Sequence, residues 1–277
     1  MGTLIDLFSY DFFLHAFWAS LLAAVSCGIV GAYIVARRIV FISGGITHAS
    51  FGGIGIGYFL GMNPLFGAAV FAVLSGLGIQ FFTQKGRLRE DSSIAIWWSL
   101  GMAVGIIFIY LSPGYAPNLM SYLFGSILTV STTEIWLMLG LCVLLIAFFS
   151  FMYRAILYVS FDEEFAKTTG LPVALINYLL ISLIALTIVL NIRVVGIILI
   201  MSLLTLPQAT ANLFTHDFKR MMLLSVFFAF MGAFAGLLFS FFADIPSGAS
   251  IIFTQVVIFA IMKLFVFLKR NRTRNGR

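Results

Sequence analysis

Apolar runs of about twenty residues follow one another along almost all of this 277-residue chain, and they constrain its fold more than any other feature. The hydrocarbon core of a bilayer is about 30 Å thick, so a helix needs about 20 apolar residues to cross it. The chain is 62% hydrophobic and only 9% charged, whereas ordinary soluble domains are about 25% charged. We therefore predict an all-α fold, a polytopic transmembrane helical bundle.

Nine spans are predicted, and their tight connections indicate a single transmembrane domain over residues 1–277. The runs lie near residues 12–36, 40–61, 65–84, 93–111, 134–153, 173–191, 194–214, 221–242 and 249–268. The count is open between eight and ten because the apolar segment 119–130 follows two prolines and is short for a span. We expect a re-entrant or interfacial helix there, since a crossing would reverse every span before it.

Basic residues gather in connections on one side of the predicted bundle. They lie at 37–38, 85–91, 154–172, 219–220 and in the tail 269–277, whereas Arg193 falls on the other side. The positive-inside rule then places these connections and the C-terminus in the cytoplasm. The tail can also meet anionic lipid headgroups. With the charge of +6 placed this way, no nucleic-acid binding is expected.

His48 is an ionisable residue inside the second apolar run. Such a residue at membrane depth is by default a candidate functional site, and a neutral imidazole can ligate a metal ion. The alternative is a histidine satisfied by a neighbour on its own helix. Composition alone leaves both interpretations open.

Two further polar features occur within or beside spans. Pro207 interrupts the seventh run and Gln208 follows it. Broken helices often line cavities in transporters, although a simple packed kink is equally consistent with the pattern. Asp11 and His15 form an i,i+4 pair at the start of the first run. They predict either an interfacial pair at a helix end or, with less support, an outer metal waypoint.

Five segments in order resemble the permease subunits of bacterial ABC importers for zinc, manganese and iron. Their similarity lies in Arg37-Arg38 followed by Thr47-His48-Ala49, in Tyr122-Leu-Phe-Gly125, in Asp162-Glu-Glu-Phe-Ala-Lys-Thr-Thr-Gly170, in Val194-Val-Gly196 followed by Ser202-Leu-Leu-Thr-Leu-Pro-Gln-Ala-Thr-Ala211, and in Asp244-Ile-Pro-Ser-Gly-Ala-Ser250. Each motif alone is weak, but five in order over nearly the whole chain are specific.

The resemblance implies a multi-pass subunit of a bacterial cytoplasmic membrane that does not itself catalyse a reaction. It implies a homodimer, or paired permeases, around a central pathway, with separate cytoplasmic ATPase chains and an extracytoplasmic metal-binding protein. The missing G-x-x-x-x-G-K-[ST] loop agrees with a separate ATPase. The cytoplasmic loop 154–172 would couple to that ATPase through a short acidic helix that contains Asp162, Glu163, Glu164 and Lys167 and closes at Gly170.

One departure from the family pattern concerns the metal. The family's aspartate, four residues before the histidine, aligns with Gly44, and Ser126 replaces an acid of some relatives. Two His48 imidazoles across a dimer axis would then remain, aided by Ser43, Thr47 or water. Imidazole suits zinc and iron, and carboxylates suit manganese. We expect zinc as the transported ion, with iron or manganese possible, and no permanently bound cofactor.

Two alternatives remain open. A permease for a metal chelate, such as a siderophore or cobalamin, would need a wide pathway without protein ligands, which the missing carboxylate would suit. A membrane enzyme or assembly scaffold would not need a docking loop. The sequence contains no H-E-x-x-H or G-x-S-x-G motif to support an enzyme.

Overall fold

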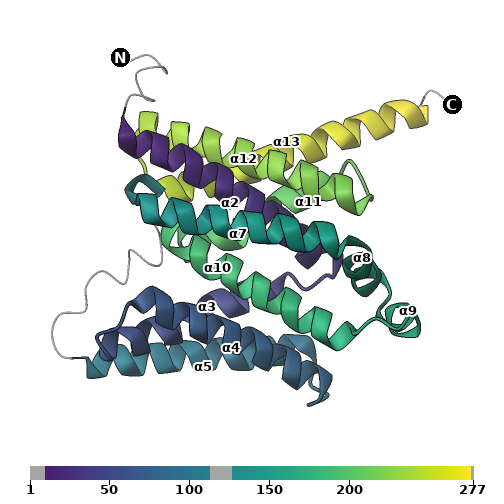
Figure 1. Ribbon diagram of the computed structural model, residues 1–277. Helices are drawn as coiled ribbons and strands as arrows, with labels where there is room; N and C mark the ends of the chain where they lie inside the picture. The colour runs from purple at the N-terminus through teal and green to yellow at the C-terminus, as the bar shows by residue number, and fades with distance from the viewer. Residues whose placement is uncertain (1–9, 113–126, 276–277) are drawn as a thin grey trace.

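Membrane-length helices make up the computed structural model, which describes residues 10–112 and 127–275 (Figure 1). Its elements are α2 (Asp11–Ala36), α3 (Phe41–Phe59), α4 (Pro64–Gln84), α5 (Glu90–Leu111), η1 (Ile127–Thr129), α7 (Thr132–Phe151), α8 (Tyr153–Phe161), α9 (Glu163–Thr168), α10 (Val173–Leu203), α11 (Leu206–Asn212), α12 (Phe218–Ala243) and α13 (Ser247–Asn275). Nine segments of this described chain are long and apolar enough to cross a bilayer. The predicted all-helical bundle of nine spans is confirmed.

The predicted sixth and seventh spans are joined within one element, α10. That helix contains a break at Gly196, where φ is +82° and ψ is 163°. α10 begins at the end of the bundle that carries α9, and α11 leads back toward that end (Figure 1). The break therefore marks the reversal between two crossings. Glycine adopts this conformation without the steric cost that a Cβ would add.

Several helices begin at a polar residue whose side chain caps the helix, and these residues lie between the apolar runs of the sequence. Asn63 Oδ1 accepts a hydrogen bond from Leu65 N at 2.9 Å at the start of α4. Ser131 and Glu134 form a capping box at the start of α7, in which Ser131 N donates to Glu134 Oε2 at 2.8 Å. Each cap satisfies backbone groups that a helix leaves unpaired.

The helix α3, which carries His48, packs closely between α4 and α5. A Cβ at Gly53 would overlap the Gly67 carbonyl of α4, and a Cβ at Gly55 would lie 2.5 Å from the Gly105 carbonyl oxygen of α5. Small residues let membrane helices approach to backbone contact in this way. Glycines of the second, third and fourth spans thus hold α3 in a fixed position.

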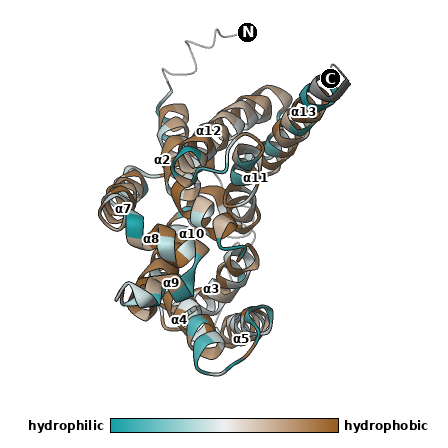
Figure 2. Ribbon diagram, turned by 90° about the vertical axis from the view of Figure 1, so that its right-hand side faces the viewer, coloured by the Kyte–Doolittle hydropathy of each residue, from teal (hydrophilic) through white to brown (hydrophobic). Residues whose placement is uncertain are grey.

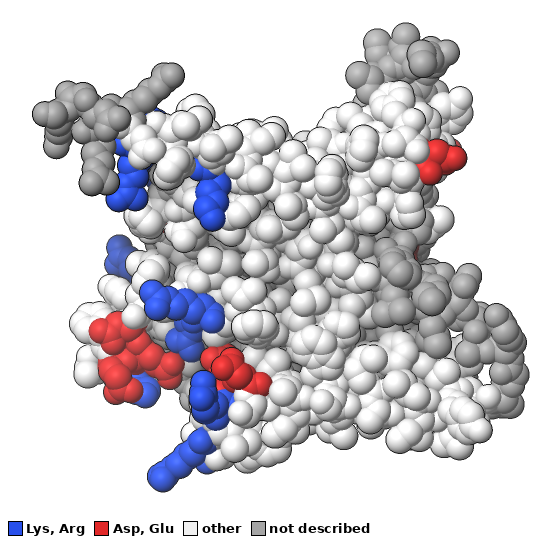
Figure 3. Space-filling model, turned by 180° about the vertical axis from the view of Figure 1, so that it is seen from behind, with Lys and Arg blue, Asp and Glu red and all other residues white. Residues whose placement is uncertain are grey.

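Charged side chains gather at one end of the bundle, which we call the charged end. Figure 3 shows most of the visible lysines, arginines and acidic residues there, around α9 and the turn before α5. Figure 2 looks onto this end and shows largely hydrophobic helices with hydrophilic turns. The clustering predicted from the sequence is therefore present in space.

α5 ends and α7 begins at the opposite end of the bundle (Figure 1). The helices on either side of residues 113–126 therefore need no crossing between them, in agreement with the predicted count of nine. The motif Tyr122–Gly125 and Ser126 lie outside the described residues, as does most of the segment 119–130.

Candidate functional site

His48 lies in the middle of α3, half-buried, with its imidazole against a tryptophan of the neighbouring helix. The ring stacks on Trp98 of α5, with centroids 4.3 Å apart and an angle of 6° between the planes. The stack fixes the ring while one side of the residue stays accessible. The close packing of α3 on α5 thus presents an oriented imidazole at membrane depth.

Gly44 lies one helical turn before His48, and other side chains occupy the space that its missing side chain leaves. A Cβ there would meet the Met201 methyl at 2.8 Å and its sulfur at 3.7 Å, with Trp98 Cζ3 also at 3.7 Å. Met201 comes from α10, beyond the Gly196 break. The site therefore combines an imidazole, an indole and a thioether from three helices, with no carboxylate at the position of the family's aspartate.

Met201 and Trp98 are the site residues that sequence reasoning missed. Trp98 lies eight residues inside α5, about two turns from the helix start. That depth, together with the glycine that replaces the family's aspartate, was the available signal.

Ser43 and Thr47, the weaker candidate ligands, are buried and engaged with their own helix. Ser43 Oγ donates to the Val40 carbonyl at 2.7 Å, and Thr47 Oγ1 donates to the Ser43 carbonyl at 2.5 Å. Hydroxyls commonly bond in this way to the preceding turn of a helix. Their protons are therefore already used within α3.

Pro207 and Gln208 are both buried at the start of α11. Gln208 Nε2 donates to the Cys27 carbonyl of α2 at 2.8 Å and to the Leu203 carbonyl at 3.1 Å. Its amide also covers Gly31, where a Cβ would lie 2.6 Å from Gln208 Cδ. Gln208 thus braces the broken helix against α2, and these contacts do not include His48.

Asp11 and His15 remain at the beginning of α2, away from His48. His15 Nδ1 lies 3.1 Å from the carbonyl oxygen of Val130, just beyond η1. With its proton on Nδ1, His15 donates this bond and ties α2 to the chain before α7. Asp11 is exposed. These contacts favour the interpretation as an interfacial pair over an outer metal waypoint.

The predicted short acidic helix is present at the charged end as α9. Asp162 Oδ1 caps it by accepting from Phe165 N at 2.9 Å, and Lys167 Nζ lies 2.7 Å from Glu164 Oε1. This hydrogen bond raises the pKa of Lys167. The helix ends at Thr168, and Gly170, which follows its C-cap, has a left-handed φ of +78°. Capping and a glycine stop together define a compact, exposed element.

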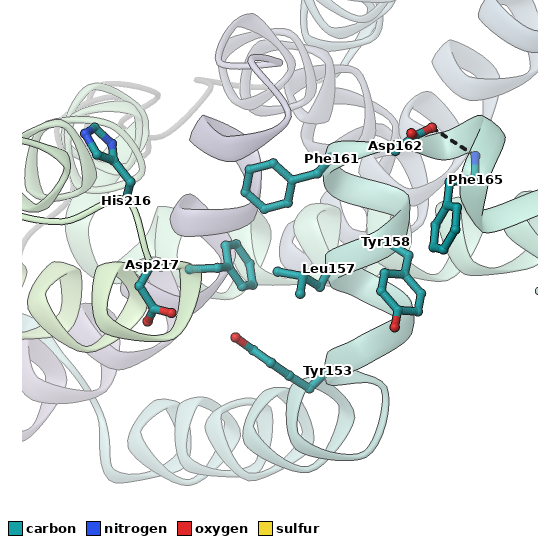
Figure 4. Close-up of a pocket in the computed structure, with 9 residues that line it drawn as sticks. Tyr153, Leu157, Tyr158, Phe161, Asp162, Phe165, His216 and Asp217 are labelled. Atoms are coloured by element: carbon teal, nitrogen blue, oxygen red, sulfur yellow. Dashed lines mark hydrogen bonds between the residues drawn. The ribbon is translucent and has the colours of Figure 1, made fainter. Parts of the chain in front are cut away.

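Beside α9 lies a cavity of about 380 Å³, formed where α8 and α9 meet the turn before α12 (Figure 4). Its walls are mainly aromatic. The charged or ionisable side chains are Asp162, Asp217 and His216, and the aromatic rings are Tyr153, Tyr158, Phe161, Phe165 and Phe218. Burial, with the carboxylate of Asp217, raises the pKa of Tyr153. The charged end thus offers a hollowed aromatic surface with acidic groups beside the exposed helix.

Within residues 10–112 and 127–275, no group of three or more His, Cys, Asp or Glu side chains is placed to hold a metal ion. One copy of the described chain therefore offers a metal ion a single imidazole at membrane depth. A closed coordination shell would require groups from a second molecule or water.

Comparison with known proteins shows similarity along almost the whole chain. The model of the ABC 3 transport family matches residues 9–266. An uncharacterised membrane protein of Synechocystis sp. is 40% identical over 95% of this chain and 93% of its own length. The manganese transport system membrane protein MntC of Halalkalibacterium halodurans is 35% identical over 94% of this chain and 89% of its own.

A solved structure agrees with these matches. PsaBC from Streptococcus pneumoniae, in complex with a Fab, superposes with a TM-score of 0.83 and 31% identity, and the match covers 93% of each chain. The overall helical arrangement of this chain is therefore shared with that solved structure.

Proposed function

The chain belongs to the ABC 3 transport family, and we propose that its His48 receives the transported metal ion on a pathway between two copies of the chain. It is the permease of an ABC metal importer, the non-catalytic membrane component of a transporter complex. The stacked, partly accessible imidazole of His48 carries the proposal. An ionisable group in a bilayer otherwise has a high cost.

Two copies related by a two-fold axis bring two imidazoles to one ion, and water or the hydroxyls of Ser43 and Thr47 complete its shell. A two-fold interface presents the same surface from both subunits, so one histidine per chain suffices for a pair. Few protein ligands also suit a pathway, because the ion must bind weakly enough to leave.

Zinc is the ion that this site suits best. Imidazole ligands suit zinc, and softer sulfur groups disfavour manganese relative to zinc. Gly44 contributes no carboxylate, and the space beside it holds the Met201 thioether. Manganese is the second candidate, because the 35% identical relative MntC is a manganese transport system protein.

The ATPase subunits that drive transport bind at the charged end, where α9 and the adjacent aromatic cavity form their docking surface. The exposed, capped helix of Asp162, Glu163, Glu164 and Lys167 presents a rigid shape, and the cavity beside it can receive an apolar or basic side chain. The positive-inside rule places this end and the C-terminus in the cytoplasm. An extracytoplasmic binding protein delivers the ion at the other end.

Metal uptake by cells that express the complete transporter tests this function. We expect His48→Ala to lower zinc uptake to about a tenth or less, the scale of losses at metal sites, while the variant still co-purifies with the ATPase. His15→Ala is the matched comparison and should retain uptake per assembled complex. If the His48→Ala transporter takes up zinc and manganese as fast as the wild type does, the role of His48 is refuted. Manganese uptake that exceeds zinc uptake in the wild type would favour the second ion.

A further inference from the structure

Arg37 joins the charged end to the helices that form the metal site. It caps the C-terminus of α2 and precedes α3 by four residues. Its Nη1 donates to the Val159 carbonyl of α8 at 2.6 Å and lies 3.3 Å from Glu163 Oε2 of α9. One guanidinium nitrogen therefore connects the α2–α3 turn to two consecutive elements of the docking region.

The α5 helix also begins within the electrostatic reach of Arg37. Its first residue, Glu90, interacts electrostatically with the Arg37 guanidinium, and the same helix carries Trp98. His48 lies on α3, which starts directly after the Arg37 turn. His48 and Trp98 thus stand on two helices that begin near Arg37: α3 follows it in the chain, and the first residue of α5 lies within its electrostatic range.

The turn beside Arg37 is fixed, so a displacement there is passed on to α3. Arg38 adopts a left-handed φ of +61°, which a non-glycine residue holds only when its surroundings impose it. Backbone bonds impose it here: Arg38 N donates to Val35 O, and Ile39 N donates to Ile34 O, both at 3.1 Å. The α2–α3 connection therefore behaves as a stiff link.

The Arg37–Glu163 ion pair is more buried than the other ion pair on α9, Lys167–Glu164. The side chains of Arg37 and Glu163 are 21% and 32% exposed, whereas those of Lys167 and Glu164 are 51% and 85% exposed. Exposed pairs contribute little because water screens them. The Arg37 pair also shares its nitrogen with a backbone carbonyl, and such charge-assisted bonds are stronger and directional.

We propose that Arg37 is a positioning residue that transmits movement of α9 to the helices holding His48 and Trp98. This rests on the proposed docking of the ATPase on α9. When the ATPase displaces α9, Glu163 and the Val159 carbonyl move the guanidinium, and the stiff turn moves the start of α3. ATP hydrolysis is thereby coupled to the accessibility of the metal site.

Uptake per ATP hydrolysed, measured with the complete transporter in proteoliposomes, tests the inference. Loss of one charge-assisted bond shifts an equilibrium about tenfold, so Arg37→Gln and Glu163→Gln should lower zinc uptake per ATP about tenfold. In Arg37→Gln, ATPase association and thermal stability should remain near those of the wild type. Asp91→Asn, which removes the exposed Arg89–Asp91 pair at the start of α5, is the matched control and should leave the ratio unchanged.

Exchange of the charges separates transmission from a merely structural role. The double variant Arg37→Glu with Glu163→Arg should regain most of the lost uptake per ATP. An assembled double variant that stays uncoupled, or single variants with the wild-type ratio, would overturn the inference. If Arg37→Gln does not assemble, Glu163→Gln decides, because it retains the arginine. A wild-type complex that transports no metal would instead contradict the proposed function.

Discussion

At the scale of single residues, the ion preference proposed for His48 depends on which side chain occupies the space beside Gly44. The Met201 methyl lies 2.8 Å from where a Cβ at Gly44 would stand. Because this methyl is the end of a flexible side chain, an aspartate at position 44 would displace it and would not force the backbone apart. Positions 44 and 48 share a helix face, so the new carboxylate would lie beside the imidazole.

The double variant Gly44→Asp with Met201→Ala should therefore shift the transporter toward manganese. A carboxylate is a harder ligand than a thioether and suits manganese. We expect the ratio of manganese to zinc uptake to rise about tenfold, equivalent to about 1.4 kcal/mol. Competition uptake of the two ions by cells measures the ratio. Met201→Leu is the control, because it removes sulfur without adding charge, and an unchanged ratio in the double variant would exclude position 44 from ion selection.

Sequence reasoning found His48 and Gly44 but not their partners, for a physical reason. An ionisable residue in an apolar run stands out by chemistry alone. Trp98 and Met201 look like other apolar residues of their spans, and only the packing of α3 against α5 and α10 brings them to the site. Gln208 was expected to line the pathway. Its hydrogen bond to the Cys27 carbonyl of α2 could not be predicted, because a local pattern does not reveal which helix a side chain faces.

At the scale of elements, the spans were predictable because length and hydropathy decide what crosses a bilayer. The predicted ends agree with the observed spans to within a few residues. The reversal between the sixth and seventh spans was predicted at Arg193, but the structure continues the helix past Arg193 and places the break at Gly196. The short helix α9 was predictable from its acidic start and its closing glycine, residues 162–170.

From the left-handed conformation of Gly170, just after α9, we predict how α9 responds to mutation. A Cβ at φ +78° costs about 1–2 kcal/mol, so Gly170→Ala should loosen the end of α9 and weaken ATPase association up to about tenfold. Titration of the purified ATPase against the permease in nanodiscs measures this. Gly140→Ala is the control, since Gly140 lies within α7 with open space around it. Equal affinity in both variants would argue against docking on α9.

At the scale of the whole molecule, the fold places the proposed docking surface and His48 apart. The proposed docking surface lies at the charged end, and His48 lies within the bundle (Figure 1). The two ends of the described chain, at Tyr10 and Asn275, lie at opposite ends of the bundle, as an odd number of crossings requires. A single copy, however, offers the ion one imidazole at membrane depth, so a site with two imidazoles requires a second copy.

Zinc X-ray absorption spectroscopy of the assembled transporter shows whether two His48 side chains share one ion. We predict one zinc ion per two permease chains, with imidazole nitrogens at about 2.0–2.1 Å, and loss of this nitrogen signal in His48→Ala complexes that still contain the ATPase. The His15→Ala complex should give the wild-type spectrum. A spectrum unchanged by His48→Ala, or one zinc ion bound per single chain, would contradict a site shared by two His48 side chains.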